Sequence, residues 1–242
     1  MAKRARLDVL LVERGIFETR SKALAAVMAG LVLVDGKPAH KAGEAVAEEA
    51  ELSLKSDPCP YVSRGGLKLR AAFNSFNIET AGRVCLDLGA STGGFTDCLL
   101  QAGAAKVYAI DVGTAQLHSK IKSDPRVVSR ENFHAKNLRP EDFLPRPSLA
   151  VIDVSFISLA QVLPFVLPCL APPYELVVLV KPQFEVGPKL APKGVVRDPA
   201  VRIQAVDKIR EAAKTLGLAE RGLIESPAKG PKGNVEFLLW LC

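Results

Sequence analysis

The segment Val84-Cys-Leu-Asp-Leu-Gly-Ala-Ser-Thr-Gly-Gly94 joins a short apolar run to a turn that is rich in glycine. The apolar run, followed by this turn and then by the helical pattern of Phe95 to Ala102, predicts a buried strand that leads into a helix. Gly89, Gly93 and Gly94 let the backbone turn sharply and let a ligand approach it closely. We therefore expect a ligand site at the carboxyl end of this strand.

Apolar runs with the length of strands continue through the chain and alternate with helical segments. Besides the run at Val84–Asp87, they cover Val107–Asp111, Val127–Ser129, Leu149–Asp153 and Leu176–Lys181. Alternation of this kind is typical of parallel strands joined by helical crossovers. The sequence predicts an α/β domain with a doubly wound, Rossmann-like sheet.

The glycine turn differs from the Gly-x-Gly-x-x-Gly pattern of dinucleotide sites, because its spacing is Asp-x-Gly-x-Ser-x-Gly. An acid placed before the first glycine suits a cationic ligand such as S-adenosylmethionine (SAM), which carries an ammonium and a sulfonium. Asp111, at the end of the second run, lies where an acid accepts hydrogen bonds from ribose hydroxyls. We predict SAM as the cofactor, bound by Asp87, Gly89, Ser91, Gly93, Gly94 and Asp111.

Composition limits the class of protein. The chain has 242 residues, of which 48% are hydrophobic and 24% charged, which is ordinary globular usage and excludes a disordered or fibrous protein. The length fits either one large α/β domain or a domain of about 150 to 180 residues with a small appendage. A net charge of +6 favours a polyanionic partner, because clustered Lys and Arg gain free energy by neutralising phosphates.

Cysteine usage and hydropathy bear on location. The chain has five cysteines without a Cys-x-x-Cys pair, and no signal segment precedes the first helical pattern, so we expect a reducing, cytoplasmic location and no metal site. Val154–Tyr174 is 21 residues long and uncharged, but it contains four prolines, which a continuous membrane helix would not tolerate. We expect no membrane association.

Residues 1–57 are predicted to form a small α+β domain. Helical patterns cover Leu7–Glu13 and Ser21–Ala29, and strand patterns cover Leu31–Val34 and Glu51–Leu54. The prolines of Asp57-Pro-Cys-Pro60 then indicate a stiff junction. We place a linker at 58–63 and the larger domain at 64–242.

The strings R-L-D-x-x-L-V, T-R-S-K-A and A-G-L-V-L-V-D-G-K in this small domain resemble the S-four-type RNA-binding domain, over roughly residues 5 to 57. In such domains, basic residues of the two helices contact the phosphate backbone. The resemblance implies this role for Arg6, Arg20 and Lys22. A solvated basic helix face is the alternative.

Four charged residues of the larger domain lie in apolar surroundings, where a charge is costly unless it is paired. Asp153 and Lys181 end two apolar runs, Lys68 lies in a predicted helix over Leu67–Phe76, and Glu236 lies inside a predicted strand over Asn234–Trp240. Strand ends are where ligands bind in doubly wound folds. We therefore predict functional roles for these side chains.

The order Lys68, Asp153, Lys181, Glu236 matches the Lys-Asp-Lys-Glu tetrad of FtsJ-like ribose 2′-O-methyltransferases. The chain resembles the TlyA family, which joins an S-four-type domain to an FtsJ-like domain. The strings that carry this resemblance are VSRGGLKL, LDLGASTGGFTDCLLQAGA, IDVSFISL, VLVKPQFE and KGPKGNVEFLLW. It implies SAM-dependent methylation of a ribose in ribosomal RNA (rRNA), with rRNA or ribosomal subunits as partners; some family members carry the name haemolysin.

A ribose hydroxyl must lose its proton as it attacks a methyl group, so a positioned base is useful. Our hypothesis makes Lys181 the base or proton relay and Lys68 a neighbouring cation that favours the neutral amine. Asp153 and Glu236 would orient both lysines.

The proline-rich stretch Pro182–Pro199 carries Lys189, Lys193 and Arg197, and the interval from Lys181 to Lys232 holds 11 basic and six acidic residues. We predict that this stretch forms part of an RNA groove or a lid; a solvated loop is the alternative. Two further classes remain as alternatives to the enzyme. One is a pore-forming haemolysin, and the other is a noncatalytic RNA-binding factor in ribosome assembly.

Overall fold

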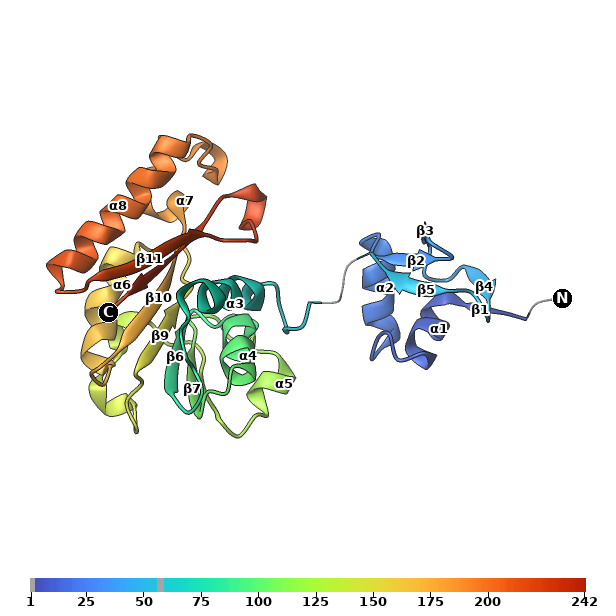
Figure 1. The fold of residues 1–242 in the computed structure, drawn as a ribbon, viewed down its shortest axis with the longest axis horizontal. Helices are drawn as coiled ribbons and strands as arrows, with labels where there is room; N and C mark the ends of the chain where they lie inside the picture. The colour runs from blue at the N-terminus through green and yellow to red at the C-terminus, as the bar shows by residue number, and fades with distance from the viewer. Residues whose placement is uncertain (1–2, 56–58) are drawn as a thin grey trace. The chain divides into compact units, whose positions relative to one another are not determined.

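The computed structural model describes residues 3–55 and 59–242 and divides into two compact units, Met1–Pro60 and Tyr61–Cys242 (Figure 1). Residues 57 and 58, where the sequence placed the end of the first domain and the start of the linker, lie outside the described residues. The side chain of Tyr61 is buried, and the Val62 N–H donates to Asp97 Oδ2 at 2.9 Å. The chain therefore joins the second unit from Tyr61 onward.

The first unit packs two helices beside short antiparallel strands. The helices are α1 (Leu7–Glu13) and α2 (Arg20–Met28), and the strands are β1 (Arg4–Arg6), β2 (Val32–Val34), β3 (Lys37–Pro38), β4 (Ala45–Ala47) and β5 (Leu52–Leu54). One sheet has the order β3-β2-β5 and the other pairs β1 with β4. The helices and the pairing strands β2 and β5 were predicted. Strands β1, β3 and β4 were missed because each has only two or three residues, which is too short to show apolar alternation.

Local sequence explains the two helices of this unit. Leu7, Leu10 and Leu11 recur at helical spacing and are buried in the core of the unit, and α2 adds Ala23 and Val27 to the same core. The Thr19 hydroxyl caps α2 by accepting from the Lys22 N–H at 3.3 Å. The two helices thus bury one apolar face each.

The second unit is a sheet covered on both faces. Its strands are β6 (Val84–Leu88), β7 (Lys106–Ile110), β8 (Val127–Arg130), β9 (Leu149–Ile152), β10 (Glu175–Val180), β11 (Glu220–Glu225) and β12 (Phe237–Leu241). Its helices are α3 (Gly65–Phe76), α4 (Gly94–Gln101), α5 (Ser119–Lys122), α6 (Leu159–Val166), α7 (Pro182–Glu185) and α8 (Pro199–Thr215). Short 3₁₀ turns cover Ala135–Asn137, Pro140–Asp142, Leu167–Cys169, Pro192–Gly194 and Pro231–Gly233.

The seven strands follow the order β11-β12-β10-β9-β6-β7-β8. Neighbours from β10 to β8 pair in parallel, whereas β12 is inserted antiparallel between β10 and β11. The predicted doubly wound α/β sheet is confirmed. The predicted strand Asn234–Trp240 is corrected at its start: pairing with β10 ends at Val180↔Phe237, because the chain leaves the sheet at Lys181, so Glu236 precedes β12.

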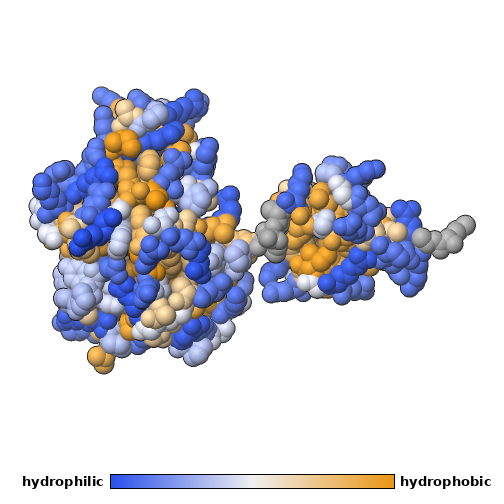
Figure 2. Space-filling view, in the orientation of Figure 1, coloured by the Kyte–Doolittle hydropathy of each residue, from blue (hydrophilic) through white to orange (hydrophobic). Residues whose placement is uncertain are grey.

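Alternate residues of each strand enter two separate cores. In β6, Cys85 packs on the side of α3 and α4, whereas Leu86 and Leu88 pack on the side of α6 and α8. Figure 1 shows these helix pairs on opposite faces of the sheet. Burial on both faces explains why the strands appear in the sequence as continuous apolar runs. The surface is different, since Figure 2 shows hydrophilic residues over most of the visible face.

Helix α8 and strand β11 were not predicted. Asp198 caps α8 by accepting from the Ala200 N–H at 2.8 Å, Pro199 occupies the first helical position, and buried apolar residues recur along the helix. The cap, the proline and the spacing of the apolar residues could all have been recognised in the sequence as a helix. The uncharged run 154–174 forms a loop, α6 and a 3₁₀ turn, and no helix within 3–55 and 59–242 is long and apolar enough to cross a membrane.

Candidate active site

The glycine turn after β6 lies directly against the end of β9. Gly89 has φ +87°, and a Cβ built on it would lie 2.3 Å from the carbonyl oxygen of Asp153. No other residue type fits there without separating the two strand ends. The turn therefore fixes Asp153, one of the predicted site residues, beside the loop that was predicted to bind a cofactor.

Gly94 serves a second close approach, at the start of α4. A Cβ on Gly94 would lie 2.2 Å from Ser63 Oγ and 3.0 Å from the backbone nitrogen of Gly66. The amino ends of α3 and α4 consequently meet at this point. This contact brings Lys68, in the first turn of α3, to the same edge of the sheet as the glycine turn.

Asp87 lies beneath the turn and is fully buried. Its Oδ2 accepts a hydrogen bond from Thr96 Oγ1 at 2.6 Å, and its Oδ1 has no partner among the described residues. Burial raises the pKa of Asp87 to about 7, and the hydrogen bond from Thr96 opposes the rise. Asp87 and Gly93 line neither of the two cavities described below, so their contact with a cofactor stays a prediction.

Asp111 follows β7 and holds the neighbouring loops together. Its two carboxylate oxygens accept from the Ser91 N–H at 2.8 Å and from the Gly113 N–H at 2.6 Å. A carboxylate has about four acceptor positions, so two remain for other donors.

A cavity of about 520 Å³ opens beside Asp111. Its walls come from the ends of β6 and β7, from the loop after β8, and from the loop and helix after β9. Ile110, Val112, Phe133 and Phe165 give it apolar walls, and Asp111 places a carboxylate on one side. We call it the apolar cavity; it suits a ligand with a flat apolar part and a hydroxylated part.

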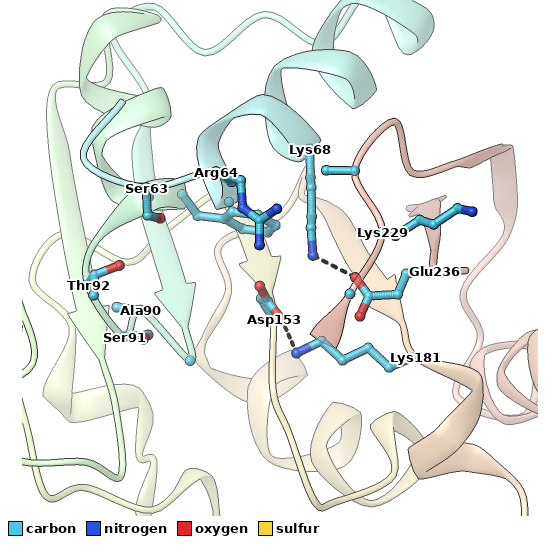
Figure 3. A pocket seen from close by; sticks show the side chains of 16 residues that line it. Ser63, Arg64, Lys68, Ala90, Ser91, Thr92, Asp153, Lys181, Lys229 and Glu236 are labelled. Carbon is cyan, nitrogen blue, oxygen red and sulfur yellow. Dashed lines mark hydrogen bonds and ion pairs between the residues drawn. The ribbon is translucent and has the colours of Figure 1, made fainter. Parts of the chain in front are cut away.

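A second cavity, of about 380 Å³, holds all four predicted catalytic residues and is called the charged cavity here (Figure 3). The two cavities share Gly89, Ser91 and Asp153, and Gly94 lines the charged one. The glycine turn therefore separates two compartments that meet at one carboxylate.

The four charged side chains form two ion pairs. Lys68 Nζ lies 2.6 Å from Glu236 Oε2, and Lys181 Nζ contacts Asp153 Oδ1 and donates to Ser155 Oγ at 3.0 Å. Each carboxylate thus contacts one lysine. The sequence-based hypothesis had both carboxylates orienting both lysines. The second oxygen of Glu236 has no hydrogen-bond partner in the described part of the chain.

Arg64, which was not predicted, points into the charged cavity from the amino end of α3 (Figure 3). Its side chain makes no hydrogen bond or ion pair within the described ranges. Because the four catalytic candidates neutralise one another, Arg64 and Lys229, which also lines this cavity, leave two positive charges in excess. The string VSRGGLKL contains this arginine, so its position next to Lys68 was visible in the sequence.

The basic residues predicted to bind RNA in the first unit are partly paired. Asp8 has a side chain only 8% exposed and accepts from Arg6 at 3.0 Å and 3.1 Å and from Arg20 at 2.7 Å and 3.3 Å. Hydrogen bonds from Arg6 and then Arg20 hold the pKa of Asp8 well below its usual range. Lys22 pairs with Glu18 at 2.5 Å. All three basic side chains remain more than half exposed, so they can also contact a polyanion.

Lys189, Lys193 and Arg197 are exposed and line neither cavity. Their role in RNA binding stays a prediction. No cluster of three or more His, Cys, Asp or Glu side chains suitable for a metal ion occurs among the residues that the structure describes.

A doubly wound sheet with one antiparallel strand beside its edge, and with a glycine turn and cavities at the strand ends, defines the class of Rossmann-like methyltransferase domains. The family comparisons agree with this class. The model of the FtsJ-like methyltransferases matches residues 61–242, and the model of the S4 domain matches residues 5–52. The chain belongs to the FtsJ-like methyltransferase family and, within it, to the TlyA proteins.

Several relatives resemble the chain over nearly its whole length. The Mycobacterium tuberculosis protein named 16S/23S rRNA (cytidine-2′-O)-methyltransferase TlyA is 48% identical, covering 100% of this chain and 91% of its own length. Hemolysin A of Brachyspira hyodysenteriae is 43% identical over 96% of this chain and 98% of its own. A solved structure from Streptococcus thermophilus that carries a hemolysin name is 44% identical, with a TM-score of 0.78, and covers 100% of this chain and 89% of that one. Hemolysin names therefore occur within the same family.

Proposed function

We propose that the protein transfers a methyl group from SAM to a ribose 2′-hydroxyl of ribosomal RNA. The observation that carries this proposal is the convergence of Lys68, Asp153, Lys181 and Glu236, from four separate segments, in one cavity beside the glycine turn. The M. tuberculosis relative, similar over the full chain, is named for this reaction on cytidine. The S4 domain supports RNA as the substrate.

The residues around the two cavities fit SAM. The apolar cavity offers apolar walls for an adenine and Asp111 for ribose hydroxyls, and it meets the charged cavity at Asp153. Buried beneath the turn, Asp87 keeps one carboxylate oxygen without a partner among the described residues, which suits a cationic ligand group reached through water. SAM would supply a methyl group on a sulfonium, which makes that methyl electrophilic.

The residues of the charged cavity then have to hold the hydroxyl and take its proton. Lys181 in its neutral form would take that proton, because Asp153 and Ser155 both contact its Nζ and fix its direction. Lys68, held by Glu236, adds a positive charge near the alkoxide that develops on the ribose. Arg64 offers a planar fork of donors, which suits an RNA phosphate near the reacting ribose.

Methyl transfer from radiolabelled SAM to isolated ribosomal subunits tests the enzyme directly. We expect incorporation with the wild-type chain and a loss of at least about 100-fold with Lys181→Ala, because a general base contributes on this order. Lys214→Ala, in the last turn of α8 and outside both cavities, is the matched control and should keep full activity. Tight binding of rRNA without any transfer would instead favour the noncatalytic assembly factor.

The contribution of the basic loop is tested by salt dependence. Replacing Lys189, Lys193 and Arg197 with Ala should weaken RNA binding and flatten the dependence of log affinity on log salt, by about one unit of slope for each phosphate that is no longer neutralised. An unchanged slope would mean that this loop is only solvated.

Leakage of dye from liposomes on addition of the protein would favour the pore-forming alternative.

A further inference from the structure

The segment Lys181–Glu185 contacts the loop after β9 at successive positions. Lys181 binds Asp153 and Ser155, Phe184 packs against Phe156, and Glu185 binds Ser158 and Leu159, so residues 181, 184 and 185 follow residues 153–159 in the same direction. The loop therefore has an anchor at each end. One anchor is the Lys181 pair of the charged cavity, and the other is Glu185.

Glu185 is a carboxylate with a side chain only 2% exposed. It accepts from the Ser158 hydroxyl, from the Leu159 N–H at 2.8 Å, and from Lys208 Nζ at 3.3 Å; Lys208 also donates to the Glu185 carbonyl oxygen at 2.7 Å. A buried carboxylate without partners is costly, so these donors have to stay in place. Two of them belong to the loop and the first turn of α6, and Glu185 consequently fixes where α6 begins.

The backbone between the anchors is strained. Phe156 has φ +64°, a conformation that a large side chain adopts only when its surroundings enforce it, and the residue is 91% exposed. Its ring contacts that of Phe184, with ring centroids 4.9 Å apart. Since little else restrains so exposed a residue, the anchors at Lys181 and Glu185 hold the loop in this conformation.

The same loop contributes to both cavities. Val154, Ser155, Phe156 and Ile157 line the apolar cavity, and Asp153, at the start of the loop, lines both. We infer that Glu185 is a positioning residue for cofactor binding and for methyl transfer, acting through Ser158 and Leu159 on the loop 154–158. The inference rests on the proposed function only where methyl transfer is the readout.

A double-mutant cycle on SAM affinity tests this role in the full-length protein. Glu185→Ala is expected to raise the Kd for SAM about tenfold and to lower kcat by a similar factor, with KM for the ribosomal subunit unchanged. Ser158→Ala should raise the Kd by a smaller factor. The double variant should bind no more weakly than Glu185→Ala alone, because both changes break one contact.

Glu175→Gln is the matched control, since Glu175 lies at the opposite end of β10 and pairs with Arg83. It should lower Tm without changing the Kd for SAM. The number of SAM molecules bound per protein at saturation distinguishes two causes of weaker binding. A displaced loop leaves this number unchanged, whereas a smaller folded fraction lowers it. If Glu185→Ala does not fold, Ser158→Ala and Glu185→Gln still decide the matter, because both keep an acceptor for the Leu159 N–H.

Hydrogen exchange of the peptide that spans residues 154–160 gives a readout without any ligand. Exchange should be faster in Glu185→Ala than in wild type, and unchanged in Glu175→Gln. Equal exchange and equal Kd, or fully additive effects of the two substitutions, would overturn the inference. If the wild type transfers no methyl group to rRNA while these differences persist, the proposed function fails and the role of Glu185 stands.

Discussion

Lys68 Nζ lies 2.6 Å from Glu236 Oε2, across 168 positions of sequence, and the glutamate side chain has no exposed surface. The pair joins the helix before the first strand of the sheet to the residue before the last strand. It therefore joins two distant segments of the domain and also places two charges in the charged cavity.

Removing one partner of this pair should destabilise the protein strongly. Lys68→Met leaves the buried carboxyl group of Glu236 without its partner, which costs about 3 to 5 kcal/mol of unfolding free energy. Urea unfolding of the isolated variant measures the loss. Methyl transfer should fall as well, even at temperatures where the variant is fully folded.

The double variant Lys68→Met/Glu236→Gln separates the two roles. Because it removes both charges, it should recover most of the stability lost in Lys68→Met but none of the methyl transfer. Full activity in the double variant would show that the pair is only structural.

Gly89→Ala tests the close approach of the glycine turn to β9. The added Cβ would collide with the Asp153 carbonyl, so Asp153 has to move and both cavities change shape. We expect SAM affinity to fall at least about tenfold, because a displacement near 1 Å is enough for a large loss at such a site. Gly217→Ala is the control. Gly217 has φ +81° but nothing within 4 Å of an added Cβ, so this substitution introduces backbone strain without a steric collision. Equal SAM affinities in the two variants would refute the steric argument.

The sheet was predictable because its strands are buried on both faces, so that Val84–Leu88 and Glu175–Val180 appear as unbroken apolar runs. The positions of Asp153 and Lys181 followed from the same rule, since parallel strands end at one edge. Glu236 was assigned to the interior of a strand because apolar residues follow it without a break. The place where β12 begins depends on where Lys181 leaves the sheet, and no local pattern carries that information.

The sequence did not predict which side chains of distant segments contact one another. Glu185 reads as one more polar residue near a proline, and its partners Ser158 and Lys208 lie 27 and 23 positions away on other elements. Which carboxylate pairs with which lysine likewise depends on packing. Asp8 is another example. The sequence did not show that Arg6 and Arg20 both donate to its carboxylate, since each could have been a solvated surface residue.

Asp8→Asn should weaken RNA binding although it makes the first unit more positive. In the folded protein, Asp8 holds the guanidinium groups of Arg6 and Arg20 side by side, and an amide accepts from them without charge and on one oxygen only. We expect affinity for rRNA to fall about threefold to tenfold as the two arginines lose their common orientation. Gel-shift titration at fixed salt measures this.

Glu13→Gln is the control for Asp8→Asn, because Glu13 is an exposed carboxylate on the same helix and its removal changes the net charge equally. It should leave affinity unchanged or increase it. If both variants bind RNA more tightly, net charge governs binding and the orientation of the arginines is irrelevant.

Asp87 should make the stability of the protein depend on pH. Burial raises its pKa from an ordinary value of 3.8 to about 7, so the folded protein keeps a proton that the unfolded chain releases. Between these two pH values the folded state binds more protons, and the contribution of Asp87 to the unfolding free energy therefore falls as pH rises, by up to about 1.4 kcal/mol per pH unit. Asp87→Asn cannot titrate but still accepts from Thr96. We expect this variant to gain stability relative to wild type from pH 5 to pH 7 and to keep a constant difference above about pH 8. Urea unfolding of both proteins at each pH measures that difference, and a difference that stays flat across the range would mean that Asp87 is ionised in the folded protein throughout.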